Sequence, residues 1–288
     1  MVSLEELANA NITDLPLRDR TNAFFAGTEQ IAAFVDEVMI PLLRGLMQPN
    51  DKEQAIIGTY YRMCLVMRAI KALNNVQHFQ TVASTVRSLF ELWLDIRMLA
   101  ADSKGDLVRG YHAFPEIERY RVAEQLTSYA NQHPGAIKLD LTPQITFLQN
   151  SAVTSRVVGS KIKSRAGKLD FPSHWSGVKS IRARAAKLGL EADYVEMYPL
   201  LSWYVHSGST GVAGLSSEAL ESCFALCHRY AQRMFLDATV ECARVTRIRE
   251  ATIDHFGRWI EELRLKPGFV ITELQINQIR EAKKASAG

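Results

Sequence analysis

The segment Phe79–Ala101 reads FQTVASTVRSLFELWLDIRMLAA and carries the strongest apolar period in the chain. Steps of four and three separate its apolar residues Val82, Val86, Leu89, Trp93, Ile96 and Ala100. Such spacing places them on one face of an α-helix. We therefore expect a central, buried helix over residues 79–101.

The same period predicts helices through most of the chain. We expect an amphipathic helix over Leu17–Met47 that Pro41 bends or splits, and a second helix from an N-cap at Asp51 to Asn75. Further helices are expected over Phe114–Asn131, over Pro143–Val158 and after a cap at Ser216 or Ser217. No segment alternates as a strand does. The sequence predicts an all-α protein: a single large helical bundle over residues 1–265 and a tail, 266–288, with a short helix.

Composition indicates an ordinary globular protein, because 47% hydrophobic and 23% charged residues match soluble averages. The first twenty residues lack the apolar core of a leader, and the apolar run over residues 55–70 is interrupted by Arg62 and Arg68. A membrane span needs roughly 18 uninterrupted apolar residues. We expect a cytoplasmic protein without a membrane partner.

The cysteines lie within helical apolar patterns and predict reduced core residues rather than disulfides. They are Cys64, Cys223, Cys227 and Cys242. Cys223, Cys227 and His228 could supply metal ligands at helical spacing, but a structural zinc site normally gathers four ligands. We expect no metal and no cofactor.

Three charged residues of the segment 79–101 call for partners. Arg87 and Glu91 are four residues apart and can pair at the edge of the apolar stripe. Arg97 falls nearer the middle of the stripe, where an unpaired charge is costly, and therefore needs a carboxylate or ligand partner. An internal ion-pair set is the favoured role, and a catalytic role is the alternative.

The stretch 198–214, YPLLSWYVHSGSTGVAG, is the best candidate site. Pro199 suits a first helical turn, and the glycines from Gly208 onward suit a helix end. Tyr198, Ser202 and His206 are spaced by four and lie along one side of this expected helix. The residues predicted to be catalytic are His206, Ser202 and Tyr198, together with Arg87 and Glu91.

A basic segment spans residues 156–187, with nine Lys or Arg residues and one acid, Asp170, for a local charge of +8. Since the whole chain carries +3, the remainder carries −5. This polarity favours a phosphate-bearing partner. Phe171 and Trp175 could stack on bases or could be hydrophobic plugs. The residues predicted to bind nucleic acid are Lys161, Lys163, Arg165, Lys168, Trp175, Lys179 and Arg182.

Missing motifs narrow the chemistry. The chain has no phosphate-binding Gly-rich loop, no His-Glu-x-x-His and no Gly-x-Ser-x-Gly elbow. Ser202 with His206 lacks the third group of a hydrolase triad. A metal-independent ribonuclease needs only a histidine for proton transfer and cations for the charged phosphorane. His206 could do the first, and Arg87 or the basic segment the second.

Three segments carry a family resemblance: RSLFEL at 87–92, HWSGVKS at 174–180 and YPLLSWYVH at 198–206. In this order they resemble an uncharacterised bacterial all-helical family, a domain of unknown function, over about residues 50–245. That family is similar to the HEPN superfamily (higher eukaryotes and prokaryotes nucleotide-binding), whose active members are dimeric ribonucleases of toxin or defence systems.

The resemblance implies a HEPN-like core with additional N- and C-terminal helices, a homodimer, and His206 in the site. At the position of the superfamily's catalytic arginine this chain has Pro199. The leading hypothesis is a protein that binds RNA or a nucleotide, with metal-free RNA cleavage by His206. The alternative is a non-catalytic helical scaffold or partner-binding module, with Tyr198, Ser202 and His206 hydrogen-bonded to Arg87 and Glu91. A small-ligand pocket near Trp93, Trp175 and Trp203 fits either.

Overall fold

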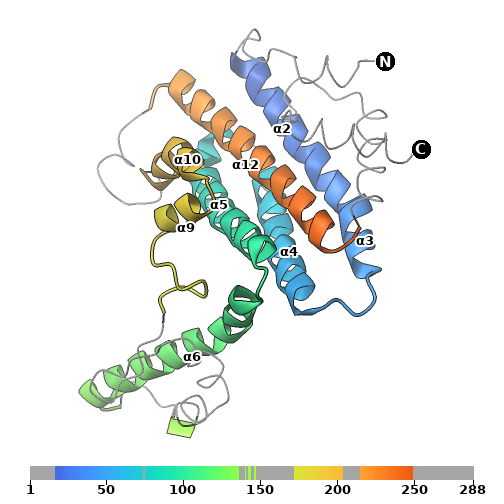
Figure 1. Cartoon of the computed structure of the whole chain (residues 1–288). Helices are drawn as coiled ribbons and strands as arrows, with labels where there is room; N and C mark the ends of the chain where they lie inside the picture. The colour runs from blue at the N-terminus through green and yellow to red at the C-terminus, as the bar shows by residue number, and fades with distance from the viewer. Residues whose placement is uncertain are drawn as a thin grey trace, which may run out of the picture. The chain divides into compact units, whose positions relative to one another are not determined.

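The computed structural model describes residues 17–73, 75–135, 140, 142–143, 146, 172–203 and 215–248. All regular structure in these ranges is helical (Figure 1), which confirms the all-α prediction for this part of the chain. The chain divides into two compact units, residues 1–100 with 185–288, and residues 101–184. The predicted domain limit at residue 265 and the tail at 266–288 lie outside the described residues and stay predictions.

The first helix is divided in front of Pro41, as expected. Helix α2 (Leu17–Phe34) runs into a π-helical turn over Val35–Met39, and α3 (Ile40–Arg44) follows with the proline in its first turn. A proline ring collides with the carbonyl four residues earlier, and a π turn is one way for a helix to relieve this contact. Pro41 therefore marks a change in helix type.

Helix α4 (Asp51–Ala72) starts one residue earlier than predicted, because its N-cap is Asn50 and not Asp51. The Asn50 side chain accepts the Glu53 backbone N–H over 3.0 Å, and the Glu53 carboxylate accepts the Asn50 N–H over 2.8 Å. This reciprocal pair is a capping box. Glu53, three residues after Asn50, is the sequence feature that selects between the two candidate caps.

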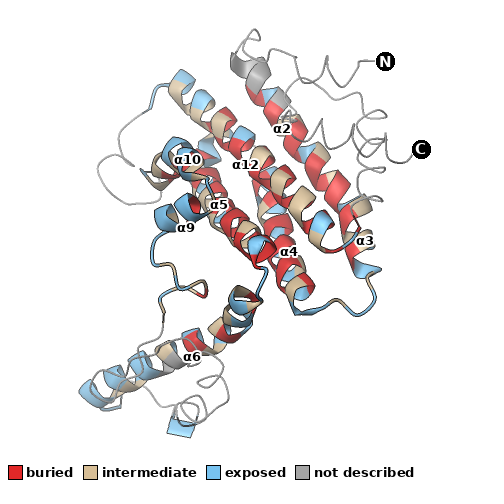
Figure 2. Cartoon of the chain, in the orientation of Figure 1, coloured by how far each residue is buried: buried red, intermediate tan, exposed pale blue. Residues whose placement is uncertain are grey.

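Helix α5 (Phe79–Ala101) has the predicted bounds, and the residues of its apolar stripe are buried. Helix α12 (Ser217–Val245) is capped by Ser216 and packs along α2 and α4. Figure 2 shows the buried faces of α2, α4, α5 and α12 as nearly continuous stripes. These helices enclose the apolar core of the first unit.

In the second unit, α6 (Asp106–Gln132) is longer than the helix expected over Phe114–Asn131, and Pro115 lies inside it. The start is fixed upstream by Asp102, whose carboxylate accepts the backbone N–H groups of Gly105 and Val108 over 3.0 Å each. Gly105 adopts a φ of 75°, which favours glycine. The predicted start at Phe114 was wrong, since the helix begins at Asp106.

Two short helices follow, α9 (Ile181–Lys187) and α10 (Glu191–Trp203), with Gly189 between them at a φ of 72°. Pro199 lies within α10, so the expectation that it opens a new helix was wrong. Glu191 and Asp193 in the first turn of α10 favour the earlier start, because acidic groups stabilise the positive end of a helix dipole. Of the helix expected over Pro143–Val158, only two residues are described. None of the described helices is long and apolar enough to cross a membrane.

Candidate functional site

Arg87, Glu91 and Tyr198 form one hydrogen-bonded group between α5 and α10, which we call the Tyr198 bridge. The Arg87 Nε–H donates to the Tyr198 hydroxyl oxygen over 2.8 Å, and this hydroxyl donates to Glu91 Oε1 over 2.9 Å. Arg87 Nε also lies 3.7 Å from Glu91 Oε1. The predicted pairing of Arg87 with Glu91 is confirmed, and the tyrosine joins the pair from the second helix.

Aromatic packing holds the tyrosine ring in place. Its centroid lies 5.4 Å from that of Phe90 and 5.2 Å from that of Tyr194, with the two tyrosine rings stacked. The Arg87 guanidinium carbon is 5.1 Å from the Tyr198 ring centroid, within the range of a cation–π contact. The residue is 6% exposed. Tyr198 is therefore positioned on both sides, by rings and by a guanidinium.

Burial raises the pKa of Tyr198 to about 12; the hydrogen bond from Arg87 opposes this rise and the one to Glu91 adds to it. The phenol therefore stays protonated at neutral pH, and its O–H group donates a hydrogen bond to Glu91. It is therefore a poor proton acceptor for a reaction. Its geometry suits it to orient Arg87.

Within the described residues, the polar contacts of Arg87 with Tyr198 and Glu91 both involve Nε. Its side chain is 24% exposed, so part of the Arg87 side chain can be reached from outside the bridge. Along the same helix, Thr85 and Ser88 donate their hydroxyl protons to the carbonyls of Thr81 and Ser84, which leaves their oxygens as acceptors. The feature of α5 that suits a phosphate ester is therefore the guanidinium of Arg87, with its fork of N–H donors, and not these hydroxyl groups.

Ser202 lies one turn after Tyr198 on α10, on the same side, as its spacing predicts. Its Oγ–H donates to the Tyr198 carbonyl oxygen over 2.8 Å, a bond within the helix. The structure brings Ser202 next to the bridge without a bond to Arg87 or Glu91. The Ser202 hydroxyl proton is used in this hydrogen bond, and no side chain among the described residues is placed to accept it as a base.

Several predicted site residues lie outside the described residues. His206 is one of them, and so is the loop with Gly208, Gly211 and Gly214. The same holds for Phe171 and for the first part of the basic segment, Lys161, Lys163, Arg165 and Lys168. Their predicted roles stay predictions.

Trp175, Lys179 and Arg182 belong to the second unit. Trp175 is only 8% exposed and meets Tyr111 of α6 edge to face, with 5.4 Å between the ring centroids. It packs as a hydrophobic plug, which is one of the two roles that the sequence left open. Lys179 and Arg182 are exposed, as cations that meet a polyanion must be.

A second polar group, between α5 and α12, confirms that Arg97 has carboxylate partners. Arg97 Nη1 lies 3.4 Å from Asp237 Oδ2 and 3.2 Å from Glu241 Oε1. Burial is the main cause that raises the pKa of Asp237. The sequence showed that Arg97 needs a partner, but nothing in it identified Asp237 or Glu241, which lie about 140 residues away.

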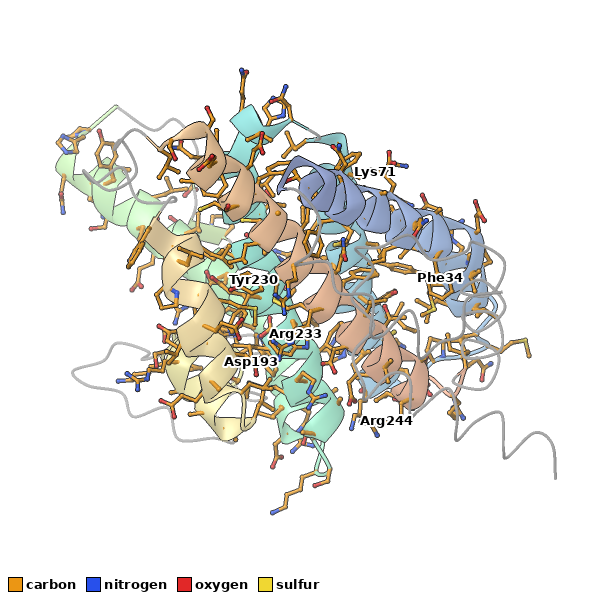
Figure 3. All side chains as sticks on the ribbon, turned by 90° about the horizontal axis from the view of Figure 1, so that it is seen from above. Phe34, Lys71, Asp193, Tyr230, Arg233 and Arg244 are labelled. Atoms are coloured by element: carbon orange, nitrogen blue, oxygen red, sulfur yellow. The ribbon has the colours of Figure 1, made fainter. Side chains whose placement is uncertain are left out.

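Arg233 of α12 makes a similar connection to α10. Its guanidinium pairs with Asp193 and lies 3.8 Å from Glu196 Oε2. Figure 3 shows Arg233 and Asp193 side by side between the two helices. Sequence analysis missed this pair, because both residues read as ordinary polar positions of helices. Together with Arg97, it fixes α12 against its neighbours through charges at the rim of the core.

His228, considered above as a metal ligand, lies in a buried polar cluster between α2 and α12. Its Nδ1 is 2.8 Å from Thr28 Oγ1, and the rings of Phe25 and Phe224 pack against it. Gln232 adds a hydrogen bond to the Phe24 carbonyl over 2.6 Å. Within the described ranges, no three potential ligands gather into a metal site. The four cysteines are free thiols, and Cys64, Cys227 and Cys242 are buried as predicted.

Comparison with known proteins identifies one family. The model of a "Family of unknown function (DUF5677)" matches residues 53–218, more than half of the 288-residue chain. The matched range includes α5 and α10, the two helices of the Tyr198 bridge. No curated protein and no solved structure matches the chain. The resemblance to a family of unknown function is thus confirmed, and the chain belongs to the DUF5677 family.

Proposed function

We propose that this protein is a HEPN-like helical protein that binds RNA or a nucleotide through a phosphate group at Arg87. In this proposal it cleaves RNA without a metal, with His206 in proton transfer, as part of a bacterial toxin or defence system. The observation that carries the proposal is the position of Arg87, whose Nε–H donates to Tyr198 and whose side chain is 24% exposed.

The Tyr198 bridge supports phosphate binding by preorganisation. An arginine that is already fixed loses little side-chain freedom when a phosphate binds its two Nη groups. Glu91 works against an anion because it lies 3.7 Å from Arg87 Nε. The Tyr198 hydroxyl donates a hydrogen bond to that carboxylate, which disperses part of the negative charge of Glu91. The bridge therefore favours a ligand that supplies a second contact, such as a nucleotide unit of RNA.

Cleavage needs a group that moves a proton and a cation that stabilises charge on phosphorus. In the proposed reaction, the ribose 2′-hydroxyl attacks the adjacent phosphorus, a base takes its proton, and the 5′-oxygen leaves with a proton. His206 is the proposed proton carrier, since it follows Ser202 by four residues in the sequence. Arg87 is the proposed cation, because Pro199 stands where the superfamily has an arginine. A homodimer is part of the proposal, and light scattering of the purified protein measures it.

The test compares wild type with His206→Ala and Arg87→Met on total RNA and on a labelled single-stranded RNA, with a metal chelator present. We expect His206→Ala to abolish cleavage and retain binding, and Arg87→Met to weaken both about tenfold or more. Arg68→Met is the matched control, since Arg68 of the same unit pairs with Asp36 on the surface. Equal cleavage by wild type and His206→Ala would exclude catalysis by His206.

A non-catalytic scaffold or partner-binding module is the second candidate, and one observation favours it. The hydroxyl groups of Tyr198 and Ser202 both donate hydrogen bonds inside the protein, to Glu91 and to the Tyr198 carbonyl oxygen, as expected of packing residues. This candidate predicts that wild type neither binds nor cleaves RNA, while Tyr198→Phe still lowers stability. RNA binding that Arg87→Met weakens and Arg68→Met leaves intact would decide against it.

A further inference from the structure

A chain of three polar side chains crosses the loop between residues 172 and 184 in the second unit. Arg184 Nη1 lies 2.7 Å from His174 Nε2, and His174 Nδ1 lies 2.8 Å from Ser176 Oγ. Arg184 is 5% exposed, whereas His174 and Ser176 are half-buried. We call Arg184, His174 and Ser176 the donor chain, because the arginine sets the direction of every hydrogen bond in it.

The direction follows from the guanidinium, which can donate hydrogen bonds and cannot accept them. His174 Nε2 must therefore accept from Arg184, so the neutral imidazole carries its proton on Nδ1. One contact opposes this tautomer, because the Ser176 backbone N–H is directed as a donor at Nδ1 over 3.2 Å. The opposite tautomer would set two donors against each other at 2.7 Å, which is the worse conflict. The Nδ1–H tautomer is therefore the one that the geometry selects.

In this tautomer the histidine donates a hydrogen bond to the serine, whereas a histidine that acts as a base accepts the proton of the serine hydroxyl. His174 Nδ1–H donates to Ser176 Oγ, and the Val178 backbone N–H also donates to Ser176 Oγ over 3.3 Å. Both lone pairs of the serine oxygen are then occupied. Its proton has no acceptor among the described residues. His174 cannot act as a base toward Ser176, and the hydroxyl is left as a donor polarised by a chain that begins at a cation.

The charges of the loop indicate what this donor meets. Residues 172–184 contain Lys179, Arg182 and Arg184 and no acidic residue. Lys179 and Arg182 are exposed. A segment whose charged residues are all cationic favours an anion over a neutral ligand.

We infer that the Ser176 hydroxyl, polarised through His174 by Arg184, donates a hydrogen bond to a phosphate oxygen of an RNA backbone that Lys179 and Arg182 attract. The RNA in this inference rests on the proposed function. His174 and Arg184 are positioning residues, and Ser176 is the residue that touches the ligand. The inference gives the second unit a phosphate contact that is independent of Arg87.

The test titrates the full-length protein with a labelled single-stranded RNA and, separately, with inorganic phosphate. Ser176→Ala removes the donor, and Ser176→Thr retains a hydroxyl. Ser128→Ala is the control, because Ser128 is an exposed serine on α6 of the same unit. We expect Ser176→Ala to weaken RNA binding about tenfold and the other two variants to bind as wild type does. Equal affinity of Ser176→Ala and wild type would overturn the inference.

A second measurement does not depend on binding. A long-range ¹H–¹⁵N spectrum reports which ring nitrogen of His174 carries the proton, with His174→Gln used to assign the signal. We expect protonation on Nδ1 alone, and a proton on Nε2 would overturn the donor chain. If wild type binds no RNA, the proposed function and the RNA contact both fail. A phosphate-induced shift at residue 176 that Ser176→Ala abolishes would then still support the Ser176 anion site.

Discussion

Trp93 of α5 donates its indole N–H to the Asp237 carboxylate of α12 over 2.5 Å, and the same carboxylate lies 3.4 Å from Arg97. Arg97 also reaches Glu241, which in turn pairs with Arg244 over 2.6 Å. Two acids thus share Arg97. Glu241 also pairs directly with Arg244, whereas the further arginine near Asp237, Arg233, acts on it only as the weakest of its electrostatic neighbours. Asp237 therefore depends on Arg97 more than Glu241 does.

We expect Arg97→Met to cost about 2 kcal/mol of unfolding free energy, because it leaves the half-buried Asp237 carboxylate without its cation. Asp237→Asn should cost about 1 kcal/mol, since an amide oxygen still accepts from Trp93. The double variant should cost little more than Asp237→Asn alone, because no charge is then left unpaired there. Urea unfolding of the three variants measures these values, and additive costs would contradict the coupling.

Tyr198→Phe removes the hydroxyl that links Arg87 to Glu91. We expect a loss of about 1 kcal/mol at pH 7, the typical net value of a buried hydrogen bond. An ordinary tyrosine has a pKa of about 10, and in the folded protein that of Tyr198 is raised to about 12. The stabilisation linked to this shift is fully present below about pH 10 and is lost as the pH rises through 12.

Absorbance at 295 nm measures tyrosinate formation and checks the shift. The difference between the titrations of wild type and Tyr198→Phe should show one phenol that ionises near pH 12. A difference curve with a midpoint near pH 10 would mean that the Tyr198 hydroxyl is not held in the bridge. Far-ultraviolet circular dichroism confirms that both proteins stay folded over the range used.

Sequence analysis predicted local structure well where one periodic pattern dominates. The bounds of α5 and the Arg87–Glu91 pair follow from spacing alone. It failed at Pro199, because local rules place proline at helix starts, whereas α10 already begins at Glu191. It also placed the start of α6 too late, at Phe114 instead of Asp106. Tyr198 was predicted as a site residue, but hydrogen bonds to Arg87 and Glu91 were only one of the roles that the sequence left open for it. Contacts such as Trp93–Asp237 join residues 144 apart, and no local pattern encodes them.

His228 predicts a loss of stability in acid. Burial lowers its pKa to about 4, whereas an unfolded histidine titrates near 6.5. The folded state therefore excludes a proton that the unfolded state binds. The stabilisation is fully present above about pH 6.5 and falls by up to about 1.4 kcal/mol per pH unit as the pH drops toward 4.

Urea unfolding at pH 7 and pH 5 checks this slope in wild type and in His228→Gln. The variant should lose part of its stability at pH 7 and show a smaller fall between the two pH values. His78→Gln is the control, because His78 is an exposed histidine. If wild type and His228→Gln lose the same free energy between pH 7 and pH 5, His228 is not the group responsible.

Gly110 and Trp175 show how closely α6 approaches the loop of the second unit. A Cβ atom at Gly110 would lie 2.6 Å from the Trp175 carbonyl oxygen, a backbone atom that cannot move without shifting the loop. In an exposed helix, Gly→Ala should stabilise by roughly 0.5–1 kcal/mol. We expect Gly110→Ala to destabilise the second unit instead, because the clash outweighs this gain.

Gly58→Ala in α4 is the matched control, since no atom outside its own helix backbone and chain neighbours lies within 4 Å of its Cβ position. Thermal unfolding should show a lower melting temperature for Gly110→Ala and a higher one for Gly58→Ala. A gain in both would mean that the loop does not rest on α6 at Gly110.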